Sequence, residues 1–137
     1  MKTGGDLLGK VALITGGTAG IGEGVAELFV EEGARVIIVG RDVERGERVA
    51  QRLSARRETL YVQGDVSQDE SVQAVFACAR RRFERLDILV NNANVEGDEY
   101  CIHEMPVEEF DRVTVSYTHL RAHETPEHLV CRLLLEK

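Results

Sequence analysis

A glycine-rich turn close to the amino terminus constrains the fold of this chain more than any other feature. An apolar run that ends at Thr15 passes into the sequence Gly16-Gly17-Thr18-Ala19-Gly20-Ile21-Gly22, and apolar residues at helical spacing follow. Glycine admits positive φ and lets backbone amides approach a ligand. The first N–H groups of a helix lack intrahelical partners and attract anions. The stretch therefore predicts a nucleotide-phosphate site, although an ordinary strand-to-helix turn has the same composition.

The spacing of the glycines narrows the kind of nucleotide site. Gly16, Gly20 and Gly22 are arranged as Gly-x3-Gly-x-Gly, which differs from the Gly-x-Gly-x-x-Gly of the commonest dinucleotide fingerprint. The turn also lacks the Gly-Lys-Ser/Thr ending of a P-loop, so we do not expect hydrolysis of a nucleoside triphosphate.

The composition is that of one globular domain in a reducing compartment. The 137 residues are 43% hydrophobic and carry a formal net charge of −7, which argues against nucleic acid or an anionic membrane as a partner. Cys78, Cys101 and Cys131 are odd in number and form no Cys-x-x-Cys pair, so we expect no disulfide framework. The sequence has no signal-peptide pattern and no run near the roughly 18 apolar residues of a membrane span. These features predict a cytoplasmic protein.

Apolar runs alternate with helical patterns along the chain. We expect strands at 10–15, 35–39, 58–63 and 86–90, helices at 20–32 and 43–57, and a third helix that begins after Ser67 and ends near Arg82. A further helix is expected after Pro106. Continuously apolar strands are typical of a parallel sheet buried on both faces. The pattern therefore predicts an α/β fold with a doubly wound parallel sheet that ends after about four strands.

The residues after the second strand bear on the type of cofactor. In a dinucleotide-binding fold the end of this strand lies beside the adenosine ribose. Arg41 can pair with a 2′-phosphate through two parallel bonds and favours NADP. Asp42 can accept hydrogen bonds from a free 2′-hydroxyl and leaves NAD open. The alternative role for Arg41 is that of a solvated loop charge.

Polar residues also follow the third and fourth strands. Ser67, with Glu70 three residues later, matches a capping box, so Asp65 has the alternative role of a simple turn residue. Asn91 and Asn92 follow a buried strand, where their amides can bond the backbone of neighbouring strands and a ligand above the sheet.

Taken in order, these motifs resemble the amino-terminal half of the short-chain dehydrogenase/reductase family. Each stands at the end of a strand, and they are Thr15-Gly16-x3-Gly20-x-Gly22, Arg41, Asp65-Val66 and Asn91-Asn92-Ala93. The likeness extends over about residues 9–113. It implies a Rossmann fold with NAD(P) across the carboxyl edge of the sheet. It also implies an oxidoreductase that transfers hydride between this cofactor and a small-molecule alcohol or carbonyl compound.

The resemblance also assigns cofactor contacts. The implied cofactor-binding set is Gly16, Thr18, Ala19, Gly20, Ile21, Gly22, Arg41, Asp65, Val66, Asn91 and Ala93. The glycines form the diphosphate turn, and Thr18 and Ile21 contact phosphate and ribose. The side chain of Asp65 and the amide of Val66 hold the adenine. The last two residues of the set line the ribose and nicotinamide side.

The sequence departs from the family pattern in ways that bear on activity. Asn94 stands where the family usually has glycine, a change that asparagine tolerates because it adopts positive φ more readily than most residues. The family's catalytic Tyr-x-x-x-Lys pair is absent: Tyr117 is followed at the fourth position by Arg121, and it comes too early in the chain. The resemblance thus implies an inactive cofactor-binding chain whose parent enzyme is a homo-oligomer. A non-catalytic dinucleotide-binding module, such as a sensor or partner subunit, is the alternative.

Residues 115–137 resemble a translation of sequencing-library adapter DNA and no protein family. From this likeness we expect residues 1–114 to form the NAD(P)-binding half-domain, with natural sequence ending near Thr114. Three histidines in the segment, His119, His123 and His128, have metal-ligand spacing, but the origin inferred for the segment argues against a metal site.

Overall fold

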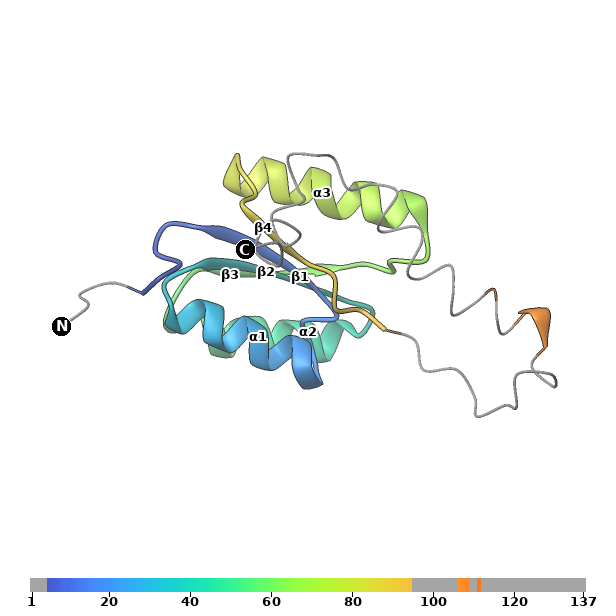
Figure 1. Ribbon diagram of the computed structural model, residues 1–137, viewed down its shortest axis with the longest axis horizontal. Coiled ribbons are helices and arrows are strands. Elements are labelled where there is room, and N and C mark those ends of the chain that lie inside the picture. Colours follow the sequence, from blue (N-terminus) through green and yellow to red (C-terminus); the bar gives the residue numbers. More distant parts are fainter. Residues whose placement is uncertain (1–4, 95–105, 109–110, 112–137) are drawn as a thin grey trace, which may run out of the picture.

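Four short apolar strands form one parallel sheet in the spatial order β3-β2-β1-β4, with helices on both faces (Figure 1). The computed structural model describes residues 5–94, 106–108 and 111. In chain order the elements are β1 (Val11–Thr15), α1 (Gly20–Glu31), β2 (Arg35–Gly40), α2 (Val43–Ser54), β3 (Thr59–Gln63), α3 (Asp69–Phe83) and β4 (Ile88–Val90). The predicted doubly wound α/β fold is confirmed. The expected helix after Pro106 lies largely outside the described residues.

Alternation along the central strands sends side chains into two separate cores. Leu13 of β1 and Ile37 of β2 face α3, whereas the next residues, Ile14 and Ile38, face α1 and α2. All four side chains are fully buried. Because successive strand residues point to opposite faces, burial on both faces requires apolar residues at every position, as the sequence pattern indicated.

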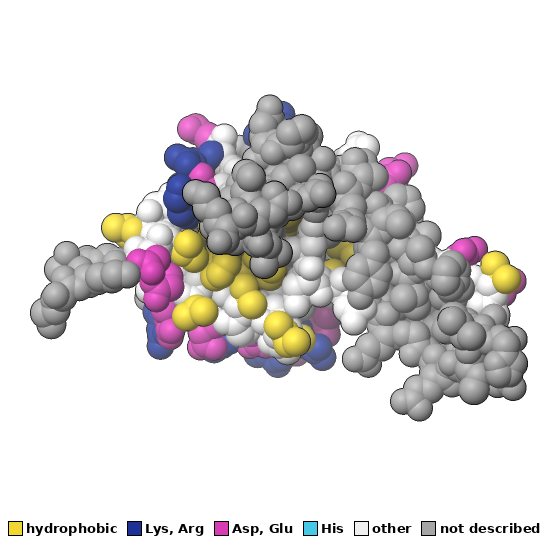
Figure 2. Space-filling view, in the orientation of Figure 1, with side chains coloured by type: hydrophobic (Ala, Val, Ile, Leu, Met, Phe, Trp, Pro, Cys, Tyr) yellow, Lys and Arg dark blue, Asp and Glu magenta, His cyan; other side chains and the backbone are white. Residues whose placement is uncertain are grey.

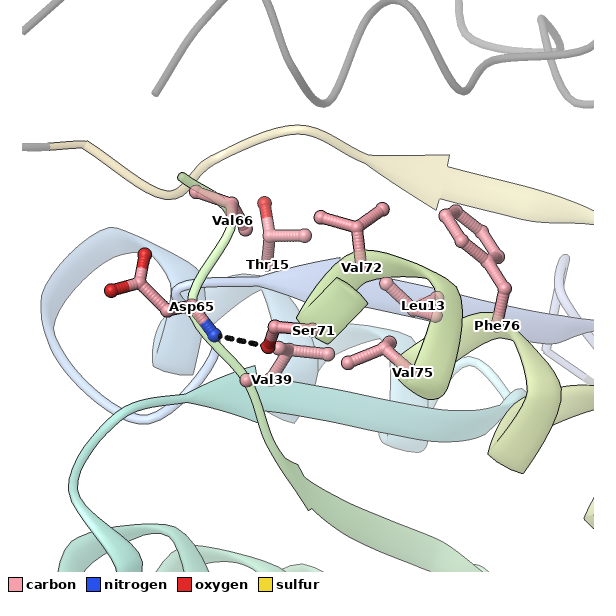
Figure 3. Close-up of a pocket in the computed structure, with 10 residues that line it drawn as sticks. Leu13, Thr15, Val39, Asp65, Val66, Ser71, Val72, Val75 and Phe76 are labelled. Atoms are coloured by element: carbon pink, nitrogen blue, oxygen red, sulfur yellow. Dashed lines mark hydrogen bonds between the residues drawn. The ribbon is translucent and has the colours of Figure 1, made fainter. Parts of the chain in front are cut away.

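Among the described elements, α3 is the one that covers the first of these two faces. Val72 and Val75 of α3 lie beside Leu13 and Val39 of the sheet (Figure 3). The hollow between these side chains measures about 10 Å³, room for about one water molecule. This hollow is a small gap in the packing and is too small for an organic ligand.

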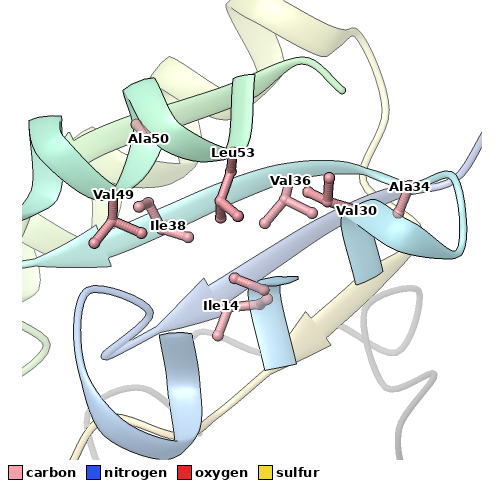
Figure 4. Packing of buried hydrophobic residues seen from close by; sticks show 9 residues of the cluster. Ile14, Val30, Ala34, Val36, Ile38, Val49, Ala50 and Leu53 are labelled. Atoms are coloured by element: carbon pink, nitrogen blue, oxygen red, sulfur yellow. The ribbon is translucent and has the colours of Figure 1, made fainter. Parts of the chain in front are cut away.

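Helices α1 and α2 cover the opposite face together. Val30 at the end of α1 and Leu53 at the end of α2 pack around Val36 and Ile38 of β2 (Figure 4). Helix α1 ends at Glu31 with Glu32 as its C-cap, and the next residue, Gly33, has a φ of +92°, as predicted for the residue after the helix end. Helix α2 ends three residues before its expected end. There the carbonyl of Leu53 accepts the N–H groups of both Arg56 and Arg57, at 3.0 and 3.2 Å, and closes a turn.

The prediction that Ser67 caps the third helix is wrong. Gln68 occupies the cap position of α3, and no side chain caps this helix. Ser67 instead donates its hydroxyl and its N–H to Asp65 Oδ1, at 2.7 and 2.9 Å. The reason is that α3 begins at Asp69, one residue later than the pattern predicts, so that Ser67 precedes the cap position and bonds to the Asp65 carboxylate instead.

Asp87, just before β4, binds the start of β1 through its carboxylate and its backbone. Asp87 Oδ2 accepts the N–H of Val11 at 2.9 Å, and the N–H of Asp87 donates to the carbonyl of Val11 at 2.9 Å. Arg85 forms an ion pair with the same carboxylate. These bonds replace regular pairing, so β4 begins at Ile88, two residues after its expected start.

Figure 2 shows apolar side chains across the middle of one face, with acidic and basic side chains mixed along its lower border, where α1 and α2 lie in Figure 1. Leu8, Leu28 and Val107 are exposed apolar residues. Within the described ranges, none of the helices has both the length and the apolar character needed to cross a bilayer.

Glycine in the middle of α2 has a packing reason that can be tested. A Cβ at Gly46 would lie 2.1 Å from Cε2 of Tyr61, whose ring is held by a 2.9 Å bond from its hydroxyl to the carbonyl of Gly40. We expect Gly46→Ala to destabilise the protein by about 1–3 kcal/mol. The matched control Gly24→Ala, in α1 with open space around it, should stabilise by about 0.5–1 kcal/mol through helix propensity. Urea unfolding followed by circular dichroism measures both, and equal effects of the two variants would contradict the packing argument.

The carboxylate of Asp87 should give the fold a measurable acid sensitivity. Burial raises the pKa of Asp87, but bonds from the Arg85 guanidinium and the Val11 N–H outweigh it and hold the pKa below its usual value. Because its pKa is lowered in the folded state, this carboxylate stabilises the protein above the unfolded pKa of about 4. That stabilisation is lost as the pH falls through the folded pKa. The difference in unfolding free energy between the parent and Asp87→Asn should therefore shrink as the pH falls below about 4. Glu47→Gln, at an exposed helix position, should follow the parent throughout this range.

Candidate functional site

A cleft of about 760 Å³ opens where the strands end at the carboxyl edge of the sheet. This volume lies within the range of sites for small molecules and cofactors. The residues that line it come from the turn after β1 and from the loops after β2, β3 and β4, and they are Gly16, Thr18, Ala19, Gly20, Ile21, Val39, Gly40, Arg41, Asp42, Arg45, Gly64, Asp65, Val66, Asn92, Ala93 and Asn94. Nine of the predicted cofactor residues are in this set; Gly22 and Asn91 are outside it.

The turn between β1 and α1 leaves backbone donors open to the cleft. Gly16 and Gly20 have φ values of +66° and +55°, a region that suits glycine. Ala19 is the N-cap of α1, and no side chain caps this helix. The first N–H groups of α1 are therefore available to an anion, and the helix dipole adds to their attraction.

Gly22 lies behind the cleft, where it permits a close approach between two loops. A Cβ at this position would lie 2.2 Å from the carbonyl oxygen of Gly16 and 2.4 Å from Nδ2 of Asn92. Asn92 Nδ2 donates to the carbonyls of Thr15 and Gly16, at 3.1 and 3.3 Å. The third glycine of the turn thus allows α1 to pack against the end of β4.

The hydroxyl of Thr15 joins the central strand to the loop after β4. This residue is 1% exposed. Its Oγ1 accepts the N–H groups of Asn92 and Ala93, at 3.1 and 3.0 Å, and donates to the carbonyl of Val90 at 3.3 Å. One buried hydroxyl therefore fixes the floor of the cleft. Thr15 belongs to the glycine motif, but the sequence does not indicate this role, because the hydrogen-bond partners of the hydroxyl lie more than 70 residues away.

The loop after β3 presents a carboxylate that is held in one orientation. Asp65 Oδ1 accepts both bonds from Ser67, and the N–H of Asp65 donates to Ser71 Oγ at 2.8 Å. Burial raises the pKa of Asp65, but the bonds from Ser67 and the nearby charge of Arg41 lower it by more, so the pKa lies below its usual value. Asp65 therefore stays ionised at neutral pH and can accept a donor such as an adenine amino group.

The end of β2 forms the border of the cleft that lies nearest to α2. Thr18 is 7% exposed, and its hydroxyl makes no hydrogen bond within the described part of the chain.

Asp42 Oδ1 accepts the N–H of Arg45 at 3.0 Å and so caps α2, while Asp42 Oδ2 lies 3.7 Å from Nε of Arg45. Arg41 is exposed and forms no ion pair among the described residues. Arg45 was not predicted from the sequence, although its position three residues after Asp42 was a usable signal.

The two consecutive asparagines have different positions. Asn92 lines the cleft and bonds the backbone of the neighbouring strand, as predicted for the amides of this pair. Asn91 is exposed and lies outside the cleft lining. The tail that contains Tyr117 and the three spaced histidines lies outside the described residues. Within the described ranges no three His, Cys, Asp or Glu residues are grouped as metal ligands.

Comparison with known proteins gives matches over most of the described chain. The family model for the short chain dehydrogenase matches residues 10–119. Zerumbone synthase from Zingiber zerumbet is 40% identical over 108 residues, which are 78% of this chain and 40% of that protein. The NADP-dependent (R)-specific alcohol dehydrogenase of Lentilactobacillus kefiri is 40% identical over 89 residues, which are 65% of this chain and 35% of that protein.

A solved structure has the same arrangement of elements. The crystal structure of 3-ketoacyl-(acyl-carrier-protein) reductase from Brucella melitensis complexed with NADH matches with a TM-score of 0.79 and 37% identity. The match covers 96% of this chain and 51% of that one. The chain thus spans about half the length of this relative and less than half of the other two.

Removal of the Thr15 hydroxyl should loosen the floor of the cleft. We expect Thr15→Val to lower the unfolding free energy by about 2–4 kcal/mol, because it leaves the N–H groups of Asn92 and Ala93 without their acceptor. Thr15→Ser keeps the oxygen and should lose only about 1 kcal/mol for the missing methyl group. Chemical denaturation measures both variants. Amide hydrogen exchange at residues 92 and 93 should accelerate in the valine variant alone, and equal exchange in both variants would contradict this role.

Proposed function

Because the chain belongs to the short-chain dehydrogenase family, we propose that it binds NADP, and less tightly NAD, in the cleft at the carboxyl edge of the sheet. Members of this family are oxidoreductases. In this proposal the chain is the cofactor-binding part of an enzyme that interconverts an alcohol and a carbonyl compound. The bound dinucleotide supplies or accepts the hydride, and the protein orients it.

The uncapped amino terminus of α1 carries this proposal. Ala19 leaves the first N–H groups of α1 without a side-chain acceptor, and the two positive-φ glycines bring the turn into the cleft. A diphosphate supplies the oxygens that these donors lack. In contrast, the side chain of Asp42 already accepts the N–H of Arg45 in the first turn of α2, so α1 is the more favourable place for the diphosphate.

The preference for NADP follows from the way in which Asp42 and Arg41 are engaged. An acidic residue at the end of the second strand selects NAD by accepting hydrogen bonds from the ribose hydroxyls. Here the carboxylate of Asp42 caps α2 and lies near Arg45, which leaves less of it for a ribose. Arg41 is exposed beside the cleft without an ion pair in the described part of the chain, and it suits a 2′-phosphate.

The same proposal assigns the remaining cofactor contacts. Asp65 and the Val66 amide hold the adenine, Thr18 and Ile21 contact the ribose and phosphate, and Ala93 lines the nicotinamide side. Asn91 is kept in the proposed set for that side, although it lies outside the cleft lining. For the parent enzyme we propose a small-molecule substrate, a homo-oligomeric state and a cytoplasmic location.

Binding without turnover is the expected behaviour of this 137-residue chain, because its sequence contains no Tyr-x-x-x-Lys pair. A non-catalytic dinucleotide-binding module is the alternative role, and it shares the binding step. The two roles differ in whether a longer parent sequence supplies the missing pair.

Titration of the chain with NADPH and NADH tests the proposal. We expect a rise in nicotinamide fluorescence on binding, with NADPH bound more tightly, and no oxidation of NADPH when a panel of small ketones and aldehydes is added. Arg41→Ala should weaken NADPH about tenfold or more, the value of a charge-assisted bond, and leave NADH nearly unchanged. Arg57→Ala, an exposed arginine beyond the end of α2, is the matched control. Absence of binding to either dinucleotide would overturn the proposed function for this chain.

A further inference from the structure

Two polar side chains of β3, the strand at one end of the sheet, bind the backbone at the end of β2. Ile38, the partner of Tyr61 in the parallel register, faces α1 and α2. Because residues two apart on a strand share a face, Tyr61 and Gln63 both lie on this side of the sheet. The Tyr61 hydroxyl donates to the carbonyl of Gly40 at 2.9 Å. Gln63 Nε2 donates to the carbonyl of Arg41 at 3.3 Å.

These bonds fix two successive peptide groups at the border of the cleft. The carbonyl of Gly40 also accepts the N–H of Gly64 at 3.1 Å, so both lone pairs of this oxygen are in use. The same planar peptide group contains the N–H of Arg41. The two bonds therefore set the direction in which the chain enters Arg41. The bond from Gln63 then holds the next peptide group, between Arg41 and Asp42.

The ring of Tyr61 is itself held against α2. A Cβ at Gly46 would lie 2.1 Å from Cε2 of this ring, so the glycine lets the ring lie directly on the helix backbone with its hydroxyl at Gly40. Burial raises the pKa of Tyr61, and the carboxylates of Asp42 and Glu47 raise it further. The hydroxyl therefore keeps its proton at neutral pH and acts as a donor.

Gly40 also touches the glycine turn after β1. A Cβ at Gly40 would lie 2.6 Å from Oγ1 of Thr18, so this part of the backbone has little room to move toward the turn. Thr18 and Arg41 both line the cleft. A displacement of Gly40 would thus be passed directly to Arg41.

We infer that Tyr61, which lies outside the cleft lining, is a positioning residue that determines the preference for NADP. It acts through the Gly40 peptide group, which sets the point from which the Arg41 guanidinium reaches a 2′-phosphate. The inference rests on the proposed function, because that function assigns the 2′-phosphate to Arg41. NADH has no 2′-phosphate, so the loss of the Tyr61 bond should affect NADPH alone.

A matched pair of variants on β3 tests the inference in the 137-residue chain. Tyr61→Phe keeps the ring against α2 and removes the hydroxyl. Thr59→Val, the control, removes a hydroxyl that donates to the carbonyl of Arg57 at 3.0 Å, at the end of β3 away from the cleft. We expect Tyr61→Phe to raise the dissociation constant for NADPH about fivefold, the value of one neutral hydrogen bond, and to leave that for NADH unchanged. Thr59→Val should change neither constant.

Three results of this titration would overturn the inference and leave the proposed function standing. They are an equal rise for NADPH and NADH in Tyr61→Phe, no rise for either, and the same rise for NADPH in both variants. The ratio of the two dissociation constants is the decisive quantity, because a general loosening of the fold weakens both dinucleotides alike.

Backbone relaxation measured by NMR on the free protein gives a second test that needs no dinucleotide. In Tyr61→Phe, we expect the order parameters of the Arg41 and Asp42 amides to fall from about 0.85, typical of a rigid backbone, toward about 0.6. Thr59→Val should keep the parent values. Unchanged order parameters in Tyr61→Phe would overturn the inference. Failure of the parent chain to bind either dinucleotide counts against the proposed function, and the order parameters then decide the role of Tyr61 by themselves.

Discussion

The close approach between the glycine turn and the end of β4 is the contact on which the rest of the site depends. The buried Thr15 hydroxyl accepts the N–H of Asn92, and the side-chain amide of Asn92 donates to the carbonyl of Thr15. The helix can come this near only because Gly22 has no Cβ to meet Gly16 and Asn92. Since these bonds join β1 and the glycine turn to the loop after β4, one small network positions both sides of the cleft.

The two helices on the same face of the sheet have opposite roles at their amino termini. Asp42 caps α2 with its own side chain, whereas Ala19 leaves α1 open. An uncapped helix end is unfavourable unless solvent or a ligand satisfies it, so the start of α1 is better suited to an anion than the start of α2. The ion pairs from Arg52 and Arg56 then hold α1 against α2. Exposed pairs of this kind stabilise weakly.

The sheet, the helices and the glycine turn could be predicted from the sequence because local patterns encode them. Continuous apolar runs gave the buried strands, and Gly33 marked the end of α1. The remaining features depend on partners that are distant or in competition. Ser67 fits a capping pattern, but the Asp65 carboxylate takes its hydroxyl. Asn91 and Asn92 are the same type of residue, and the alternating direction of side chains along the extended backbone decides that the amide of Asn92 reaches the glycine turn. The pairing of Arg52 with two glutamates on another helix has no local signal at all.

The order of the motifs also explains how cofactor binding can be separated from hydride transfer along a chain of this kind. Each lining loop follows a parallel strand, and parallel strands deliver their carboxyl ends to one edge. Within the described part of the chain, the residues that line the cleft lie between Gly16 and Asn94. Proton transfer to an alcohol or carbonyl oxygen needs a positioned acid or base, and the cleft-lining set offers only carboxylates that are already engaged, Asp42 as a helix cap and Asp65 with Ser67. The geometry of this edge thus suits recognition of a dinucleotide.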